Sequence, residues 1–366
     1  MPSTSNTADW LNELLVPAAR ELPSPSAYLA HVDAAAADPT LIRLASNENS
    51  EPPSPRVRAA LEAVYDEAHL YPPTVPPLRA AIADRHGVPP ASVLLGAGST
   101  EVIDATLRAF VRAGDEVVIP TPCWPVLRMR LNALDASLVD VPLADDGESF
   151  VFDVDALLAA VTPRTKVVVI CTPNNPTGNS LDFDDLSRCA DAGPLLLVDA
   201  AYADFDEEHD ATPLARKSGR VVVTRTFSKA YALSGLRVGY ALGDADLLDH
   251  VARMLVPGSS VSVAGLSAAH AALADEKYVR RQIERVRAER ERLMTALRAL
   301  RLRTFASRAN FVAVEPASVG RTPAELAAAL RERGVLIRPM DDRLARITVG
   351  SPEANAALLA ALTSLI

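Results

Sequence analysis

The sequence predicts an α/β fold with a mostly parallel sheet, and two features of its central region support this. Short, continuous apolar runs recur between residues 90 and 225, and helical patterns separate them. Strands that are apolar throughout are buried on both faces, which is typical of a parallel sheet covered by helices. The chain has 366 residues, 49% of them hydrophobic, which is enough for a large domain and a smaller one.

The expected elements of this region follow from these runs. Strands are predicted over residues 92–96, 116–120, 166–171, 195–199 and 220–224. Helices are predicted over residues 100–112, from about 126, and over 183–192. The segment before the sheet, residues 1–44, is interpreted as an arm with a short helix near residues 10–22, followed by Pro-rich polar sequence.

The last part of the chain predicts a second, smaller unit. A long charged amphipathic helix is expected over residues 276–300 as a link between domains. Beyond it, strands near 310–315, 335–338 and 346–350 alternate with helices near 323–334 and 352–365, typical of an α+β unit. We therefore predict an N-terminal arm with part of the small domain (1–44), a large domain (45–275) and a C-terminal small domain (276–366).

Composition excludes several classes of function. A net charge of -9 argues against general nucleic-acid binding, which needs a basic face. No apolar run reaches 18 residues and no signal-peptide pattern begins the chain, so neither a membrane span nor secretion is expected. The three cysteines are scattered, which favours a reducing cytoplasm and no metal site. The six histidines show no ligand spacing, and we assign them no role.

The run from Arg225 to Tyr240 (RTFSKAYALSGLRVGY) is the most informative stretch. It places Lys229 in a loop after an apolar strand, with Ser228 beside it and Arg237 eight residues later. Such a lysine can form a Schiff base with an aldehyde, while the hydroxyl and guanidinium hold an anion. This combination indicates a pyridoxal 5'-phosphate (PLP) site. The alternative is a surface turn with ordinary basic residues.

Polar residues follow three of the predicted strands, at the sheet edge where ligands bind in open α/β folds. Asp199 ends a run of leucines, and a buried carboxylate there needs a cationic partner. A protonated pyridine nitrogen fits, and so does a helix cap or a structural ion pair. Asn175 and Tyr202 can both hydrogen-bond one phenolic oxygen, although Tyr202 fits core packing equally well. The turn that carries Asn175 can also be only a turn.

A phosphate cradle is predicted where Gly98, Ser99 and Thr100 join a strand to a helix, because backbone N–H groups converge there. Together with Ser228 and Arg237, this glycine turn makes a complete anion site. Trp124 follows another strand end, where an indole can stack on a pyridine ring or pack in the core. Arg346 begins a late strand, and its guanidinium suits a substrate carboxylate.

Taken together, residues 40–350 resemble the fold-type I PLP enzymes of the class I and II aminotransferase family, and most closely its histidinol-phosphate aminotransferase branch. The motifs that carry the resemblance are 44–49 (LASNEN), 71–72 (YP) before 78–79 (LR), 96–101 (GAGSTE), 173–178 (PNNPTG), the Lys229 run, and 336–340 (LIRPM) with 346–350 (RITVG). The resemblance implies a mostly parallel seven-stranded sheet in the large domain. It also implies transfer of an amino group between an amino acid or amino-alcohol phosphate and a 2-oxo acid.

The resemblance also implies roles for individual residues. Lys229 is the Schiff-base lysine and proton shuttle, and Asp199 and Tyr202 complete the catalytic set. The implied cofactor-binding residues are Gly98, Ser99, Thr100, Trp124, Asn175, Asp199, Tyr202, Thr226, Ser228, Lys229 and Arg237. Tyr71 would reach the phosphate of the neighbouring subunit, which implies a homodimer with shared active sites. The implied substrate-binding residues are Arg346, Asn175 and Tyr28.

The chain departs from the family pattern in three segments. Residues 50–53 read SEPP where the family has proline and a glycine-containing turn, and Ala200 replaces an acid. Residues 341–343 (DDR) replace a longer loop near the substrate. The resemblance therefore implies the cofactor and leaves the substrate open. A PLP-dependent decarboxylase, elimination or cyclising enzyme of specialised amino-acid metabolism is the alternative. A PLP-sensing regulator would need an appended DNA-binding domain, which the short arm does not supply.

Overall fold

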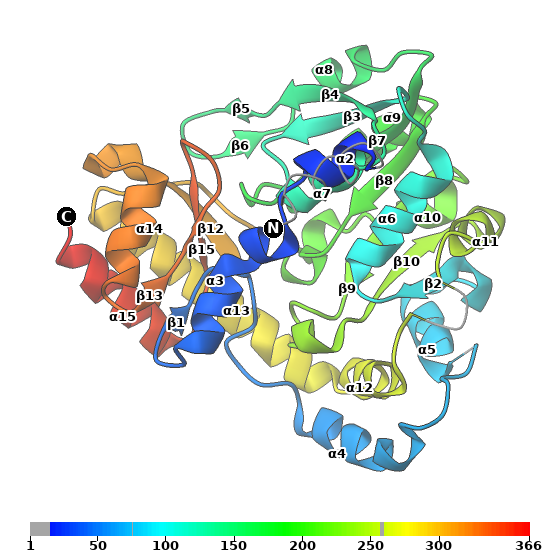
Figure 1. Ribbon diagram of the computed structural model, residues 1–366, viewed down its shortest axis with the longest axis horizontal. Helices are drawn as coiled ribbons and strands as arrows, with labels where there is room; N and C mark the ends of the chain where they lie inside the picture. Colours follow the sequence, from blue (N-terminus) through cyan, green and yellow to red (C-terminus); the bar gives the residue numbers. More distant parts are fainter. Residues whose placement is uncertain (1–14, 75, 257–259) are drawn as a thin grey trace, which may run out of the picture.

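A seven-stranded sheet forms the centre of the computed structural model, which describes residues 15–74, 76–256 and 260–366 (Figure 1). The strand order is β2 (Val93–Gly96), β10 (Gly239–Gly243), β9 (Val221–Thr226), β8 (Leu195–Asp199), β7 (Thr165–Cys171), β3 (Glu116–Thr121) and β4 (Ser137–Pro142). Every neighbouring pair is parallel except those of β10, which is antiparallel to both β2 and β9. The predicted mostly parallel sheet of seven strands is confirmed.

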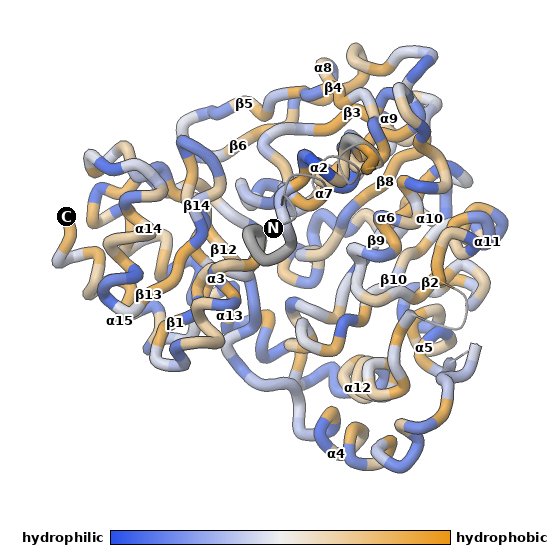
Figure 2. The backbone as a smooth tube through the Cα atoms, viewed as in Figure 1, coloured by the Kyte–Doolittle hydropathy of each residue, from blue (hydrophilic) through white to orange (hydrophobic). Residues whose placement is uncertain are grey.

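Successive residues of the central strands enter two different hydrophobic clusters, which shows that both faces of the sheet are buried. Val167 and Val169 belong to one cluster, whereas Val168 and Ile170 belong to the other. The first face is covered by α6 (Ser99–Phe110), α7 (Pro125–Asn132) and α11 (Ala245–Ala252). The second is covered by α5 (Pro77–His86), α8 (Val154–Ala159), α9 (Phe183–Asp191), α10 (Leu214–Lys217) and α12 (Val263–Leu273). Figure 2 shows hydrophobic residues along the central strands of this sheet.

A second, four-stranded sheet lies near the C-terminus, in the order β11 (Arg303–Thr304), β12 (Phe311–Glu315), β15 (Ala345–Thr348) and β14 (Arg338–Pro339). The helices around it are α13 (Glu276–Ala299), α14 (Pro323–Arg331) and α15 (Pro352–Thr363). A short strand β1 (Ile42–Arg43) pairs in parallel with β13 (Val335–Leu336), so the end of the arm packs on this unit. The domain boundaries at 44/45 and 275/276 stay a prediction.

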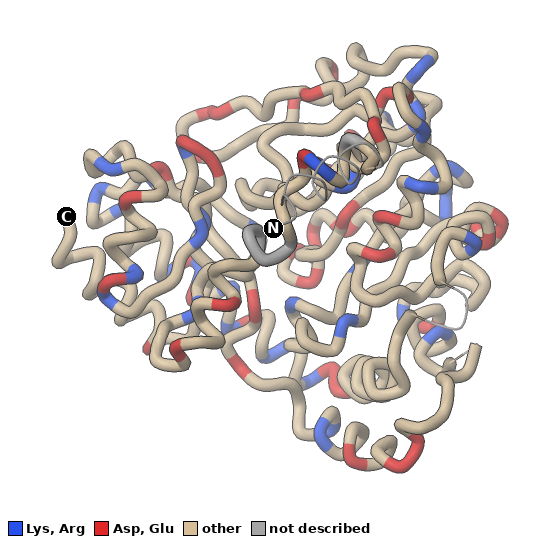
Figure 3. The backbone as a smooth tube through the Cα atoms, viewed as in Figure 1, with Lys and Arg blue, Asp and Glu red and all other residues tan. Residues whose placement is uncertain are grey.

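The remaining elements are short and lie outside the two sheets. They are α2 (Pro17–Glu21), α3 (Pro25–Ala37), α4 (Pro55–Ala63) and the ribbon of β5 (Ala144–Asp145) and β6 (Phe150–Val151), with single turns of 3-10 helix between elements. Figure 3 shows basic and acidic residues intermixed over both domains. In the part of the chain that the structure describes, no helix has the length and apolar character needed to cross a bilayer.

Three local expectations differ from the structure. The Pro-rich stretch of the arm contains α3, because Pro25 occupies the first helical turn, where proline is tolerated. The described part of the predicted helix near residues 10–22 is only α2, and residues 1–14 lie outside the described residues. The strand expected over 335–338 is divided, since β13 pairs with β1 and β14 pairs with β15.

Candidate active site

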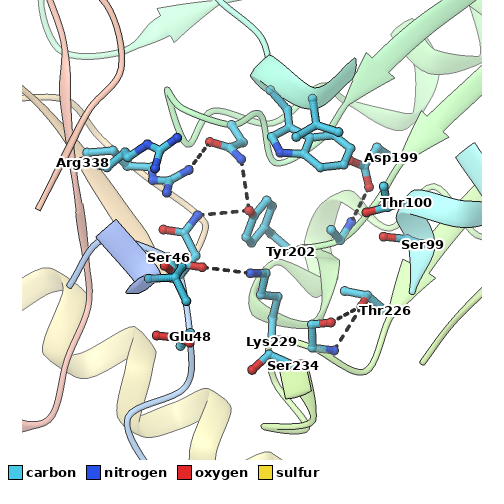
Figure 4. A pocket seen from close by; sticks show the side chains of 18 of the residues that line it. Ser46, Glu48, Ser99, Thr100, Asp199, Tyr202, Thr226, Lys229, Ser234 and Arg338 are labelled. Atoms are coloured by element: carbon cyan, nitrogen blue, oxygen red, sulfur yellow. Dashed lines mark hydrogen bonds between the residues drawn. The ribbon is translucent and has the colours of Figure 1, made fainter. Parts of the chain in front are cut away.

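A cavity of about 260 Å³ lies where the carboxyl ends of β7, β8 and β9 meet the N-terminus of α6 (Figure 4). The loop after β1 and the strands β14 and β15 close it from the side of the small domain. This is the edge at which open α/β sheets bind ligands. The predicted site residues that line it are Ser99, Thr100, Trp124, Asn175, Asp199, Tyr202, Thr226, Ser228, Lys229, Arg237 and Arg346.

The anion cradle forms around the first turn of α6. Gly98 is the N-cap residue with φ 82°, and no side chain caps the helix, so its first N–H groups can bind a ligand. A Cβ at Gly98 would stand 2.7 Å from Nη2 of Arg237, so only glycine lets that guanidinium approach. The Ser228 hydroxyl accepts a hydrogen bond from Thr226 Oγ1 at 2.9 Å, which leaves its own hydrogen to donate. These groups together can hold a phosphate.

Asp199 is a buried carboxylate at the end of β8, 7% exposed. Its Oδ1 accepts a hydrogen bond from the Ala201 N–H at 3.2 Å, and the Cys171 thiol donates to Oδ2 at 3.8 Å. Burial raises the pKa of Asp199 to about 6, an effect that these hydrogen bonds only partly oppose. A cation at this position would favour the ionised form.

Lys229 lies in the loop after β9 and points into the same cavity, and Nζ donates to the backbone oxygen of Ser46 at 3.2 Å (Figure 4). Burial and then the charge of Arg346 lower the pKa of Lys229 to about 8. The amine is therefore deprotonated more readily than an exposed lysine, as a nucleophile or base requires. Nζ lies 5.8 Å from the centroid of the Tyr202 ring.

A chain of hydrogen bonds joins the two domains across the cavity. Arg346 Nη1 donates to Asn175 Oδ1 at 2.7 Å, and Asn175 Nδ2 donates to the Tyr202 hydroxyl at 3.2 Å. Asn47 Nδ2 donates to the same hydroxyl at 3.0 Å. Because Tyr202 Oη accepts two hydrogen bonds from the protein, its single hydrogen can be donated to a ligand.

Trp124 lies at the first turn of α7 and lines the cavity, where it also packs against the cluster on one face of the sheet. The position of the indole is therefore compatible both with stacking on a pyridine ring and with packing in the core, the two uses that the sequence left open. Leu29 and Val32 of α3 and Val126 of α7 add apolar surface to the cavity.

Two predicted residues lie elsewhere. Tyr71 does not line the cavity, and 93% of it is exposed. The side chain of Tyr28, in α3, lies outside the described residues. The expected role of neither residue is tested within a single chain.

Sequence reasoning missed several residues that line the cavity. They are Leu29, His31, Val32, Ser46, Asn47, Glu48, Val126, Ala201, Ser234 and Arg338. Ser46, Asn47 and Glu48 belong to the LASNEN motif and Arg338 to LIRPM, so the motifs could have placed them near the site. His31, to which the sequence assigns no role, lines the cavity and contacts Arg338, 307 residues away, a contact that no local pattern reveals.

The raised pKa of Asp199 leads to a stability prediction for the ligand-free chain. Above pH 6 the carboxylate is ionised in both the folded and unfolded chain, and its burial destabilises the fold; below about pH 4 it is protonated in both. Asp199→Asn should therefore raise the free energy of unfolding by on the order of 2 kcal/mol at pH 7. This gain should disappear as the pH falls from 6 to 4, measured by urea unfolding.

The exposed carboxylate of Asp191 provides the control, because Asp191→Asn should change little at either pH. An equal loss of stability in Asp199→Asn at pH 7 and pH 4 would contradict the raised pKa.

Known proteins resemble this chain over most of its length. The family model described as "Aminotransferase class I and II" matches residues 39–362. Histidinol-phosphate aminotransferase 2 of Caulobacter vibrioides is 38% identical over 333 residues, covering 88% of this chain and 86% of the relative. An aromatic amino acid aminotransferase of Rhodococcus opacus is 39% identical over 331 residues, covering 89% and 90%.

A solved structure agrees with these relatives. It is the histidinol-phosphate aminotransferase of Sinorhizobium meliloti in complex with pyridoxal-5'-phosphate, which is 27% identical, with a TM-score of 0.83 over 96% of this chain and 98% of that one. The cavity described above contains a lysine, a buried carboxylate and an anion cradle, which are the groups that this cofactor needs. The chain thus belongs to the class I and II aminotransferase family and is a PLP-dependent aminotransferase of fold type I.

Proposed function

We propose that the cavity holds PLP with its phosphate at the α6 cradle and its ring nitrogen at Asp199. The cradle supports this assignment, since Gly98, Ser228 and Arg237 converge on one point. Thr226 supports it indirectly, because its hydroxyl accepts the Ser228 N–H at 3.1 Å and so orients that residue. Trp124 would stack on the ring, and Asn175 and Tyr202 would contact the ring oxygen.

The proposed roles follow from the chemistry of each group. When bound, PLP supplies an aldehyde that joins the Lys229 amine and a ring that takes up electrons as the substrate loses its α-proton. Lys229, with its pKa lowered to about 8, accepts that proton at Nζ and later returns it. Asp199 would be ionised beside the ring nitrogen and would keep that nitrogen protonated. Tyr202 would donate its hydrogen to the ring oxygen.

Lys229→Ala tests the role of the lysine. The variant should lose turnover completely, because Lys229 is the one lysine among the described residues that line the cavity, and its amine both forms the covalent link and moves the proton. Borohydride reduction followed by peptide mass analysis should find the cofactor on Lys229 in the parent protein. Lys277→Ala, at an exposed lysine of α13, is the control and should behave like the parent. Turnover in Lys229→Ala at the parent rate would refute the assignment.

The substrate we propose is a primary amine with an anionic group and an apolar body. The observation that carries this is the position of Arg346, which is 7% exposed and donates to Asn175 and to the Ala45 carbonyl at 2.6 Å. Arg338 lines the same side of the cavity, and Leu29 and Val32 offer apolar surface. Aromatic amino acids and histidinol phosphate, the substrates in the names of the relatives, are both primary amines with an anionic group. A 2-oxo acid is the proposed amino acceptor.

Arg346→Gln tests this anion site. Removing a buried, hydrogen-bonded guanidinium should lower kcat/KM for the amino donor by about ten- to a hundredfold. Arg346→Lys should recover only part of it, because an ammonium lacks the planar fork. Arg253→Gln, at an exposed arginine of α11, is the control. Assays with aromatic amino acids and with histidinol phosphate show whether the amino donor carries a carboxylate or a phosphate. An unchanged kcat/KM in Arg346→Gln would exclude this site for the substrate anion.

We also propose a homodimer in which Tyr71 contributes to the partner's site. The exposure of Tyr71 supports this, together with the neighbouring Leu70 (58% exposed) and the exposed Tyr65 (79%) and Val256 (73%). Large apolar side chains so exposed are typical of association surfaces. A cytoplasmic location is a further proposal, which the three free cysteines support.

Mixed dimers of Lys229→Ala and Tyr71→Ala test the shared site. If Tyr71 acts in the partner's site, a mixed dimer gathers both defects in one site and leaves the other intact. Co-expression of the two variants with different tags should therefore give dimers with clear activity, although each variant alone is impaired. Inactive mixed dimers would mean that Tyr71 acts within its own subunit, and a fully active Tyr71→Ala homodimer would mean that Tyr71 has no role in either site.

A further inference from the structure

Arg338 and Arg346 lie directly opposite each other on the antiparallel strands β14 and β15. Directly opposed residues of such a pair lie on the same face of the sheet, and like charges there repel. Both side chains line the active-site cavity. Arg346 is held by the Asn175 side chain and the Ala45 carbonyl.

His31 of α3 supplies an interaction with Arg338. Arg338 Nη1 contacts both ring nitrogens of His31, Nδ1 and, at 3.2 Å, Nε2, and Nε2 also lies 2.9 Å from Ser46 Oγ. Arginine can only donate, so one nitrogen of a neutral imidazole can accept its hydrogen bond. The imidazole thus lies between Arg338 and Ser46 and contacts both.

The electrostatics around His31 agree with that geometry. Burial, followed by the charges of Arg338, Arg346 and Arg43, lowers the pKa of His31 to about 4. The ring is therefore neutral at pH 7 and can accept a hydrogen bond. The carboxylate in this part of the cavity, Glu48, is bound by both Nε and Nη2 of Arg43, at 3.1 and 2.7 Å.

We propose that His31 is a positioning residue that fixes the guanidinium of Arg338 beside that of Arg346, and thereby sets the affinity of the pocket for the anionic group of the substrate. The inference rests on the proposed function, which places that group at Arg346. A guanidinium held in place before binding loses less side-chain entropy when the anion arrives. Loss of the His31 contact removes one of the interactions that oppose the repulsion between Arg338 and Arg346.

The test uses holoenzyme and the variants His31→Leu and His31→Asn. Leucine removes the acceptor, whereas the asparagine oxygen can occupy the position of Nδ1. We expect His31→Leu to raise the Kd of inorganic phosphate, measured by its competition with the amino donor, and the KM of that donor by about tenfold. The kcat should stay within about twofold, because the interaction serves binding in the ground and transition states alike. His31→Asn should recover most of the affinity.

A double-mutant cycle shows whether His31 acts through Arg338. Arg338→Gln should weaken phosphate binding, and adding His31→Leu to it should cause no further loss. Asp33→Asn, at an exposed position of the same helix, is the matched control and should leave all values unchanged. Ser46→Ala, which removes the second anchor of the imidazole, should shift the Kd in the same direction by less, and it tests the proposal even if His31→Leu does not fold.

Several outcomes would overturn the proposal. The first is an unchanged Kd and KM in His31→Leu or, should that variant not fold, in Ser46→Ala. The second is a His31→Asn variant that binds phosphate as weakly as His31→Leu. The third is a further loss of phosphate affinity, as large as in the parent protein, when His31→Leu is added to Arg338→Gln. A failure of the proposed function would look different, because Arg346→Gln would then leave phosphate binding and KM unchanged whatever residue stands at position 31.

Discussion

The arrangement of the active site depends on one hydrogen bond, from Arg346 to the side-chain oxygen of Asn175. An amide has one acceptor oxygen and one donor nitrogen, so committing the oxygen to Arg346 turns the nitrogen toward Tyr202. Arg346 comes from β15 in the small domain, while Asn175 follows β7 in the large one. The geometry around the cofactor ring therefore depends on how the two domains sit together.

The second constraint is electrostatic. Burial disfavours the charged form of both Asp199 and Lys229, raising the pKa of the first and lowering that of the second. Neither group is in its most favourable environment without a ligand. In the proposed roles, a ring with a positive nitrogen and an aldehyde would satisfy both at once, since it would pair with the carboxylate and take up the amine. The same groups that destabilise the ligand-free pocket would thus favour binding of such a cofactor.

The sequence was sufficient for the features that depend on local pattern. The apolar runs of β3, β7, β8 and β9 predict the parallel sheet, and residue types at their ends predict the groups that meet in the cavity. Features that depend on distant contacts were not accessible. β10 begins and ends with glycine, and its position depends on pairing with β2, more than 140 residues earlier. The role of His31 required knowledge of its contact with Arg338, across the two ends of the chain.

Helix α3 supplies Leu29, His31 and Val32 to the cavity, while the proposed cofactor-binding groups come from the large domain. These groups are not independent of α3, because Ser46 contacts His31 through its hydroxyl and accepts a hydrogen bond from Lys229 at its backbone oxygen. A substitution in α3 that moves His31 therefore also acts on the residue that holds the Lys229 amine.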